Sequence, residues 1–207
     1  MIGNMWVELA DPSVVKKTID ALEGRGFHVE FLNSKEKSLE RLKNFIPPSA
    51  EVMTGSSTTL KEIGFVDLLS SGKHTWNNLK EKIVSEKDPK KQAELRKKSI
   101  TSEYFLGSVH AVTQSGEVVI ASATGSQLAS YVYASNNVIW VVGTQKIVSN
   151  LEEGFRRIRE YVFPLEDQRM KQAGFKGSTI AKILIFEKET LPLRKITIIF
   201  VNEKLGF

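Results

Sequence analysis

The apolar run at residues 138–142 constrains the fold of this chain more than any other feature of its sequence. Its letters are VIWVV, without the alternation of polar and apolar residues that a half-exposed strand shows. Such a run is typical of a strand that is buried on both faces, in a sheet covered by other layers on both sides. The sequence therefore predicts an α/β fold in which residues 138–142 form a strand of the sheet.

Helix and strand candidates alternate over the rest of the chain. Asp11 can cap a first helix, with Pro12 tolerated in its first turn, and Asn150 can cap a later one. The last two strand candidates are joined by a short turn, so we expect an antiparallel or mixed edge there. The expected helices cover residues 11–22, 34–45, 126–133 and 150–161, with two exposed helices within 77–99, and the other expected strands cover 27–31, 50–53, 109–113, 118–121, 183–186 and 196–201.

Nothing in the sequence divides the chain into separate modules. No repeat of 20–50 residues and no low-complexity tract is present, and 207 residues lie within the range that folds around one core. We therefore expect one domain over residues 1–207, with its core at about 10–205 and a helical elaboration at about 75–100. The hairpin of 109–113 and 118–121 is expected at the centre.

The composition excludes several chemistries. The chain has no Cys, so it forms no disulfide and offers no thiolate for catalysis or for an iron–sulfur cluster. No stretch approaches the roughly 20 apolar residues that span a bilayer, and no export signal is visible, so we expect a cytoplasmic protein without a membrane partner. We expect no cofactor and no metal, because His28, His74 and His110 are scattered along the chain.

The net charge of +5 arises from 29 basic and 24 acidic residues and favours anionic partners only weakly. Much of the basic charge lies at 77–99, which is typical of a solvated helical face. A nucleic-acid surface is the alternative, but clustered arginines and aromatic residues are missing there, so nucleic acid is not the expected partner.

A Gly/Ser/Thr turn follows the strand candidate at 50–53 and precedes a helix candidate. Gly permits close approach of the backbone, and hydroxyls beside free N–H groups can bind the oxygens of a phosphate or carboxylate. The simpler alternative is that one of the turn's hydroxyls caps the helix. The candidate ligand-binding residues of this turn are Thr54, Gly55, Ser56, Ser57, Thr58 and Thr59.

Two further turns resemble the first. One follows the strand at 118–121 and contains Gly125, Ser126 and Gln127. The other follows the strand at 138–142 and brings Lys146, either as a cation for an anionic ligand or as a solvent-facing side chain. Turns at the carboxyl ends of neighbouring strands face the same crevice in open α/β sheets. We therefore expect the three turns to converge on one site.

Catalytic residues are harder to assign. His110 can titrate near neutral pH but is also a common kind of wall residue. Glu103 and Glu117 flank the predicted hairpin and are either general bases or ordinary surface carboxylates. The patterns Gly-x-Ser-x-Gly, Gly-x-Gly-x-x-Gly and the Walker loop are all absent, which disfavours an α/β-hydrolase, a Rossmann dehydrogenase and a P-loop protein.

Four strings carry a resemblance to a known family. They are MTGSSTTLKEIG at 53–64, YFLGSVHAVT at 104–113, GEVVIASATGSQL at 116–128 and VVGTQKIV at 141–148. Together they resemble LUD-domain proteins (LutC/YkgG-like, lactate utilisation), over most of residues 10–205. The resemblance implies a single three-layer domain of the sugar-phosphate isomerase and CoA-transferase type (NagB/RpiA/CoA-transferase-like), with a mixed, largely parallel sheet and helices on both faces.

The same resemblance implies a function. The chain is expected to bind a small anionic metabolite, a carboxylate or phosphate, in lactate or organic-acid utilisation, with isomerase- or transferase-like catalysis and simple binding both open. The alternative is a non-catalytic subunit or scaffold for iron–sulfur oxidoreductase partners. A homo-oligomer is compatible with either function.

Overall fold

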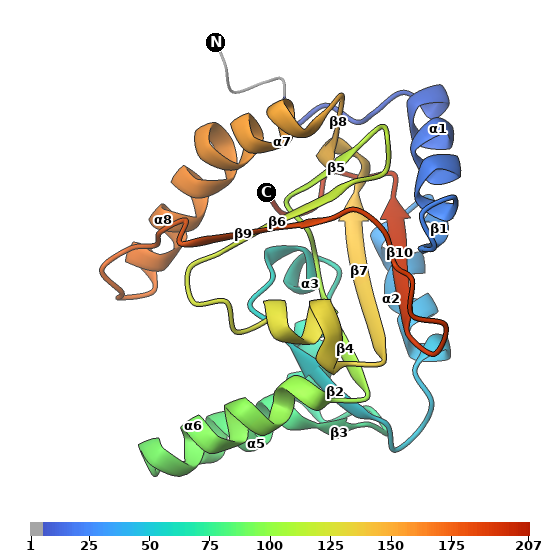
Figure 1. The fold of residues 1–207 in the computed structure, drawn as a ribbon. Helices are drawn as coiled ribbons and strands as arrows, with labels where there is room; N and C mark the ends of the chain where they lie inside the picture. Colours follow the sequence, from blue (N-terminus) through green and yellow to red (C-terminus); the bar gives the residue numbers. More distant parts are fainter. Residues whose placement is uncertain (1–5) are drawn as a thin grey trace.

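The computed structural model describes residues 6–207 as two stacked sheets with helices around them (Figure 1). The strands are β1 (His28–Leu32), β2 (Glu51–Thr54), β3 (Asn77–Asn78), β4 (Tyr104–Gly107), β5 (Ala111–Thr113), β6 (Val118–Ser122), β7 (Asn137–Gly143), β8 (Ile147–Val148), β9 (Lys182–Phe186) and β10 (Lys195–Val201). The helices are α1 (Pro12–Glu23), α2 (Lys35–Phe45), α3 (Thr58–Glu62), α4 (Phe65–Ser71), α5 (Leu79–Ser85), α6 (Pro89–Lys98), α7 (Leu151–Arg157) and α8 (Phe163–Gln172).

Short helical turns complete the assignment. They lie at Ser99–Thr101, Ser130–Ala134, Thr144–Lys146 and Ile158–Val162, and the last of these joins α7 to α8. Polar side chains begin several helices as the sequence indicated: Ser34 accepts a hydrogen bond from the backbone N–H of Lys37 and starts α2. Asp11 stands at the start of α1, but its side chain makes no capping hydrogen bond.

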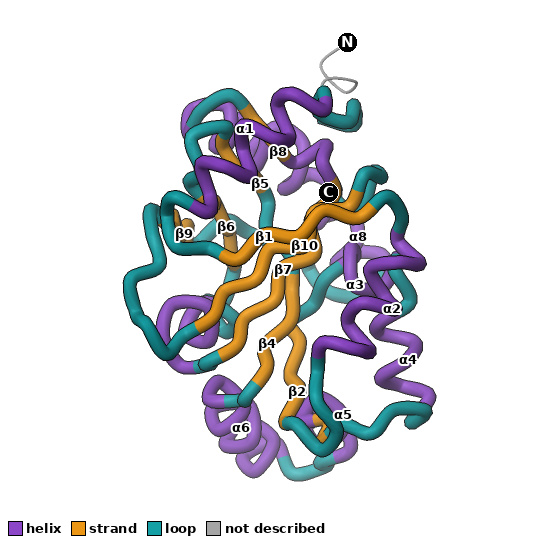
Figure 2. Tube along the Cα trace, turned by 90° about the vertical axis from the view of Figure 1, so that its right-hand side faces the viewer, coloured by secondary structure: helices purple, strands orange, loops and turns teal. Residues whose placement is uncertain are grey.

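The larger sheet has the order β1-β10-β7-β4-β2-β3, and every neighbouring pair in it is parallel. Figure 2 shows these strands side by side, with α2 and α4 to one side. The predicted strand at 138–142 is β7, which lies between β10 and β4 and is fully buried along residues 138–143. The α/β fold with a largely parallel sheet is confirmed.

The smaller sheet has the order β8-β5-β6-β9, with β6 antiparallel to both of its neighbours. It packs face to face on the larger sheet through alternate residues of the strands. Trp140 of β7 and Ile120 of β6 lie in this shared core, whereas Ile139 faces α2–α4 and Val119 faces α7. The layers are therefore α2–α4, the parallel sheet, the mixed sheet and α7, with α1 packed beside the mixed sheet.

Two details differ from the sequence prediction. The hairpin of β5 and β6 lies in the smaller sheet and not at the centre of the parallel one, and the last two strands lie in different sheets. Strand β9 forms the expected antiparallel edge, but β10 is inserted between β1 and β7. Strands of both sheets are covered on both faces and are therefore apolar. For this reason the apolar pattern alone does not show to which sheet a strand belongs.

The expected helical elaboration corresponds to α5 and α6, which extend from the β3 end of the parallel sheet (Figure 1). Helix α6 has no buried residue, in agreement with the predicted exposed helices. Within residues 6–207 no helix is both long and apolar enough to cross a membrane.

Candidate functional site

The first Gly/Ser/Thr turn joins β2 to α3. Ser57 caps α3, since its hydroxyl accepts the backbone N–H of Leu60 at 3.2 Å, so the simpler role foreseen for this turn is realised. Thr59 is buried, whereas Ser56 is exposed and Thr58 is partly exposed. The turn therefore combines a hydroxyl that caps the helix with hydroxyls that are accessible to solvent.

The second turn follows β6. Its backbone is held by Ser122, whose hydroxyl accepts the N–H of Gly125 at 2.9 Å and donates to the side-chain oxygen of Gln127 at 3.2 Å. Gly125 has a positive φ of 83°, which favours glycine, while Ser126 is exposed. The second turn is thus a hydrogen-bonded loop of small residues, with Ser126 at the surface.

The first turn lies close to both of the others. A Cβ atom added to Gly55 would come into van der Waals contact with the Cβ of Gln127, at 3.6 Å, so the second turn lies beside the first. Lys146 Nζ donates to the hydroxyl of Thr59 at 3.2 Å and links the third turn to the first. The turns come from both sheets, and the stacking of the sheets brings them together.

Lys146 is buried at the end of the third turn. Besides Thr59, its Nζ donates to the hydroxyl of Ser108 at 3.1 Å and to the carbonyl oxygen of Val109 at 3.1 Å. All three partners are neutral, and no carboxylate pairs with Lys146 within the described part of the chain. Burial, and then the positive charge of Arg157, hold the pKa of Lys146 well below its usual range, with the charge of Glu62 acting in the opposite direction.

Arg157 on α7 is the second buried cation. Its Nη1 donates to the carbonyl oxygen of His110, while Nε and Nη2 have no hydrogen-bond partner among residues 6–207. The guanidinium lies 5.3 Å from the centre of the Tyr161 ring. Burial lowers the pKa of Arg157 to about 10, so it stays charged at neutral pH. Sequence reasoning missed this residue.

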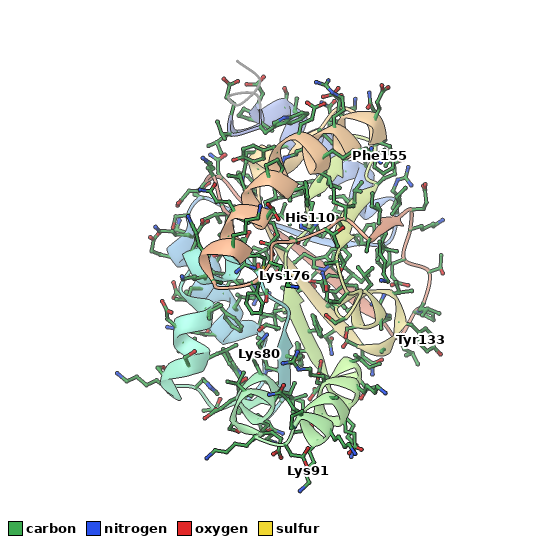
Figure 3. The ribbon with its side chains drawn as sticks, turned by 90° about the vertical axis from the view of Figure 1, so that its left-hand side faces the viewer. Lys80, Lys91, His110, Tyr133, Phe155 and Lys176 are labelled. Carbon is green, nitrogen blue, oxygen red and sulfur yellow. The ribbon has the colours of Figure 1, made fainter. Side chains whose placement is uncertain are left out.

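His110 connects the two cations. Its Nδ1 accepts the backbone N–H of Ala121 at 3.0 Å, so in the neutral ring the proton lies on Nε2. Burial, Lys146 and Arg157, in that order, lower the pKa of His110 to about 3. His110 is therefore a neutral donor at physiological pH, and Figure 3 shows it below α7, which carries Phe155, and above Lys80.

Residues 205–206 cover Lys146 from the remaining side. Gln145 Nε2 donates to the carbonyl oxygen of Leu205 at 2.8 Å, and the N–H of Gly206 donates to Glu62 at 2.6 Å. A Cβ at Gly206 would lie 2.4 Å from the hydroxyl of Thr59 and 3.3 Å from Lys146 Nζ. The sequence did not predict this cover.

More basic side chains flank the turns. Lys80 of α5 is partly buried and its Nζ donates to the carbonyl oxygen of Thr54 at 3.4 Å. Burial, with a contribution from Arg96, lowers the pKa of Lys80. A Cβ at Gly125 would lie 2.8 Å from the Cδ of Lys182, which places that lysine beside the second turn. The surroundings of the turns are thus basic.

The two carboxylates considered as bases lie elsewhere. Glu103 is exposed and precedes β4, so it is at the opposite end of that strand from the turns. Glu117 directly precedes β6, again at the far end, and accepts hydrogen bonds from Ser115, Thr113 and Arg25. Burial opposes ionisation of Glu117, but these hydrogen bonds prevail and lower its pKa. Glu117 is a structural acceptor.

Comparisons with known proteins establish the family of this chain. The fold and the grouped turns define a layered α/β protein with a basic, small-residue site at the ends of its strands. The model of the LUD domain matches residues 15–201, and the chain belongs to the LUD-domain family.

A solved structure supports the same fold. The crystal structure of a DUF162 family protein from Deinococcus radiodurans is 10% identical, with a TM-score of 0.54, over 94% of this chain and 100% of that one. No curated protein matches the chain. At this identity the similarity establishes the fold alone.

Proposed function

We propose that the chain binds a small anionic metabolite, a carboxylate or phosphate, where the three turns meet Lys146, Arg157 and His110. The observation that supports this most strongly is the pair of buried basic side chains, Lys146 and Arg157, without a carboxylate partner among residues 6–207. A buried unpaired charge is costly in free energy, and proteins generally pair it or bind a counter-ion.

The neighbouring groups suit an anion as well. The guanidinium of Arg157 has two nitrogens, Nε and Nη2, with no hydrogen-bond partner among residues 6–207, and a guanidinium binds carboxylate and phosphate oxygens in a bidentate manner. The Nε2–H of His110 is a further neutral donor. Hydroxyls of the first turn and the amide of Gln127 can complete the coordination of the oxygens.

The biological setting is proposed from the family. Membership of the LUD-domain family is consistent with a role in lactate or organic-acid utilisation, and we propose organic acids as the first ligands to test. Small carboxylates carry one charge and few other groups, which fits a site with one charged guanidinium, a lysine of lowered pKa and short polar side chains.

A thermal-shift titration tests this proposal. L-Lactate, pyruvate, inorganic phosphate and a sugar phosphate are each titrated against the full chain. A ligand of the site raises Tm, and the stabilisation grows with the logarithm of one plus its free concentration divided by Kd. In Lys146→Met the affinity falls by about tenfold to a hundredfold, because a charged hydrogen bond is lost. Lys91→Met on exposed α6 is the control and leaves the affinity unchanged (Figure 3).

A subunit role is the second candidate. Tyr133 and Leu193 are large apolar residues with 74% and 94% exposure, and Arg194 connects their two segments by donating to the carbonyl oxygen of Ser135 at 3.0 Å. Exposed apolar residues on a fixed surface are typical of protein contacts. If this candidate holds, an iron–sulfur oxidoreductase co-purifies with the chain and is lost in Tyr133→Ser/Leu193→Ser, while the thermal shifts above are absent.

A further inference from the structure

The amine of Lys146 differs from the other lysines in its surroundings. It has three hydrogen-bond partners, all of them neutral oxygens, and the charge of the Arg157 guanidinium acts on it more strongly than that of the Glu62 carboxylate. A buried lysine beside another cation loses its proton more readily and becomes a nucleophile. Lys146 thus has the environment of a reactive amine.

Arg157 lies near Lys146 and can hold a ligand beside its amine. Lys146 donates to the carbonyl oxygen of Val109 and Arg157 to that of His110, the next residue along the chain. The positive charge of Arg157 also contributes to the lowered pKa of Lys146, so the two basic groups lie near each other. A small acid whose carboxylate is bound by Arg157 can therefore present its next carbon to Nζ.

Hydroxyl groups beside the amine can move protons. Ser108, which is partly exposed, lies 3.1 Å from Nζ and also donates to the carbonyl oxygen of Val141 at 2.7 Å. Thr59 lies 3.2 Å from Nζ. A hydroxyl both donates and accepts, so either residue can pass a proton between the amine and an oxygen atom on the ligand.

We propose that Lys146 captures a 2-oxo acid covalently, its Nζ forming an imine with the carbonyl carbon while Arg157 holds the carboxylate. The inference rests on the anion site proposed above. The nitrogen lone pair attacks the carbonyl carbon and the carbon–oxygen double bond breaks. Both hydrogens of the neutral amine leave with that oxygen as water, and a carbon–nitrogen double bond forms. The step needs no oxidant or reductant.

Borohydride trapping tests the imine directly. The full chain is incubated with pyruvate at pH 7, reduced with sodium borohydride, digested and mapped by mass spectrometry. L-Lactate, which has the carboxylate but no carbonyl, is the matched ligand. We expect one adduct per chain, on the peptide with Lys146, at least about tenfold above any other lysine, because ordinary lysines have a pKa near 10.4 and are almost wholly protonated at pH 7.

Variants separate the roles of the two proposals. Lys146→Arg keeps the cation and loses the adduct, whereas Lys91→Arg on exposed α6 keeps the adduct; circular dichroism checks that each variant is folded. If pyruvate and lactate both raise Tm but no adduct forms, the imine is wrong and the anion site stands. If neither ligand raises Tm and no adduct forms, both proposals fail. Adducts spread over surface lysines in the wild-type protein would also contradict the proposed imine at Lys146. This outcome can be read from the wild-type peptide map alone, so the test holds even if Lys146→Arg does not fold.

Discussion

His110 shows how a residue's protonation couples to the stability of the whole fold. Its ring is neutral in the folded protein, because burial and two neighbouring cations lower its pKa to about 3. In the unfolded chain a histidine titrates near pH 6.5, so between these two values the unfolded state binds the extra proton. Acid therefore favours unfolding over this range.

This linkage gives a prediction for pH. From pH 6.5 to 5 the free energy of unfolding falls by an amount on the order of 1–2 kcal/mol through His110. His110→Asn keeps an acceptor for the N–H of Ala121 but does not titrate, so its urea unfolding curves change less over the same interval. Equal pH dependence in the two proteins would contradict this account.

Gly107 gives a second prediction at the residue scale. A Cβ there would stand 1.8 Å from the hydroxyl oxygen of Tyr131, which lies buried against Phe105 and Trp140. Gly107→Ala lowers the free energy of unfolding by about 1–3 kcal/mol, as overpacking does. Tyr131→Phe in the same chain removes the clashing oxygen and restores part of the loss.

Gly24→Ala is the control for Gly107→Ala, because its Cβ would meet only carbonyl oxygens at 3.5 and 3.6 Å, in ordinary contact. Its stability stays within about 0.5 kcal/mol of wild type. A similar loss at both positions would show that the clash with Tyr131 is not the cause.

At the scale of elements, the segment that follows β10 is the cover of the candidate site. Gly206→Ala pushes this segment away from Thr59 and Lys146, since the added carbon would lie 2.4 Å and 3.3 Å from their polar atoms. We expect faster acetylation of Lys146 by acetic anhydride, measured by peptide mapping. Gly72→Ala is the matched control, because Gly72 has a φ of 66°, close to the 61° of Gly206, but no neighbour within 4 Å among the described residues. An equal rise in the acetylation rate of Lys146 in Gly72→Ala would show that a general loss of stability, and not movement of the cover, exposes the lysine.

The sequence predicted the helices, strands and turns better than it predicted which of them pack together. The apolar run of β7 and the turns at Thr54–Thr59 and Lys146 could be read locally, because burial and small-residue turns leave a pattern over a few positions. Arg157 could not be found this way. It stands beside Arg156 on the same helix, and only the packing of α7 on β5 buries Arg157 and leaves Arg156 exposed.

At the scale of the whole molecule, Trp140 joins the two sheets. It lies on β7 and packs against Phe27, Tyr131 and Phe186, the last of which belongs to β9 in the other sheet. We propose that both sheets form one cooperative domain. Unfolding followed by tryptophan fluorescence and by far-ultraviolet circular dichroism should give one coincident transition.

Trp140→Ala extends this test. It lowers the stability by about 3–5 kcal/mol and shifts both signals together, because the cavity lies in the core that both sheets share. A variant in which one signal moves and the other does not would instead show two units that unfold separately.

Because β10 lies between β1 and β7, the parallel sheet cannot be completed during synthesis until β10 has been made. Strand β1 is made early, yet its neighbour in the sheet is residues 195–201, and β7 keeps an open, apolar edge until that stretch leaves the ribosome. Unpaired strand edges favour aggregation in incomplete chains. The nascent protein therefore depends on rapid closure by β10, and ribosome stalling before residue 195 leaves the edges of β1 and β7 unpaired.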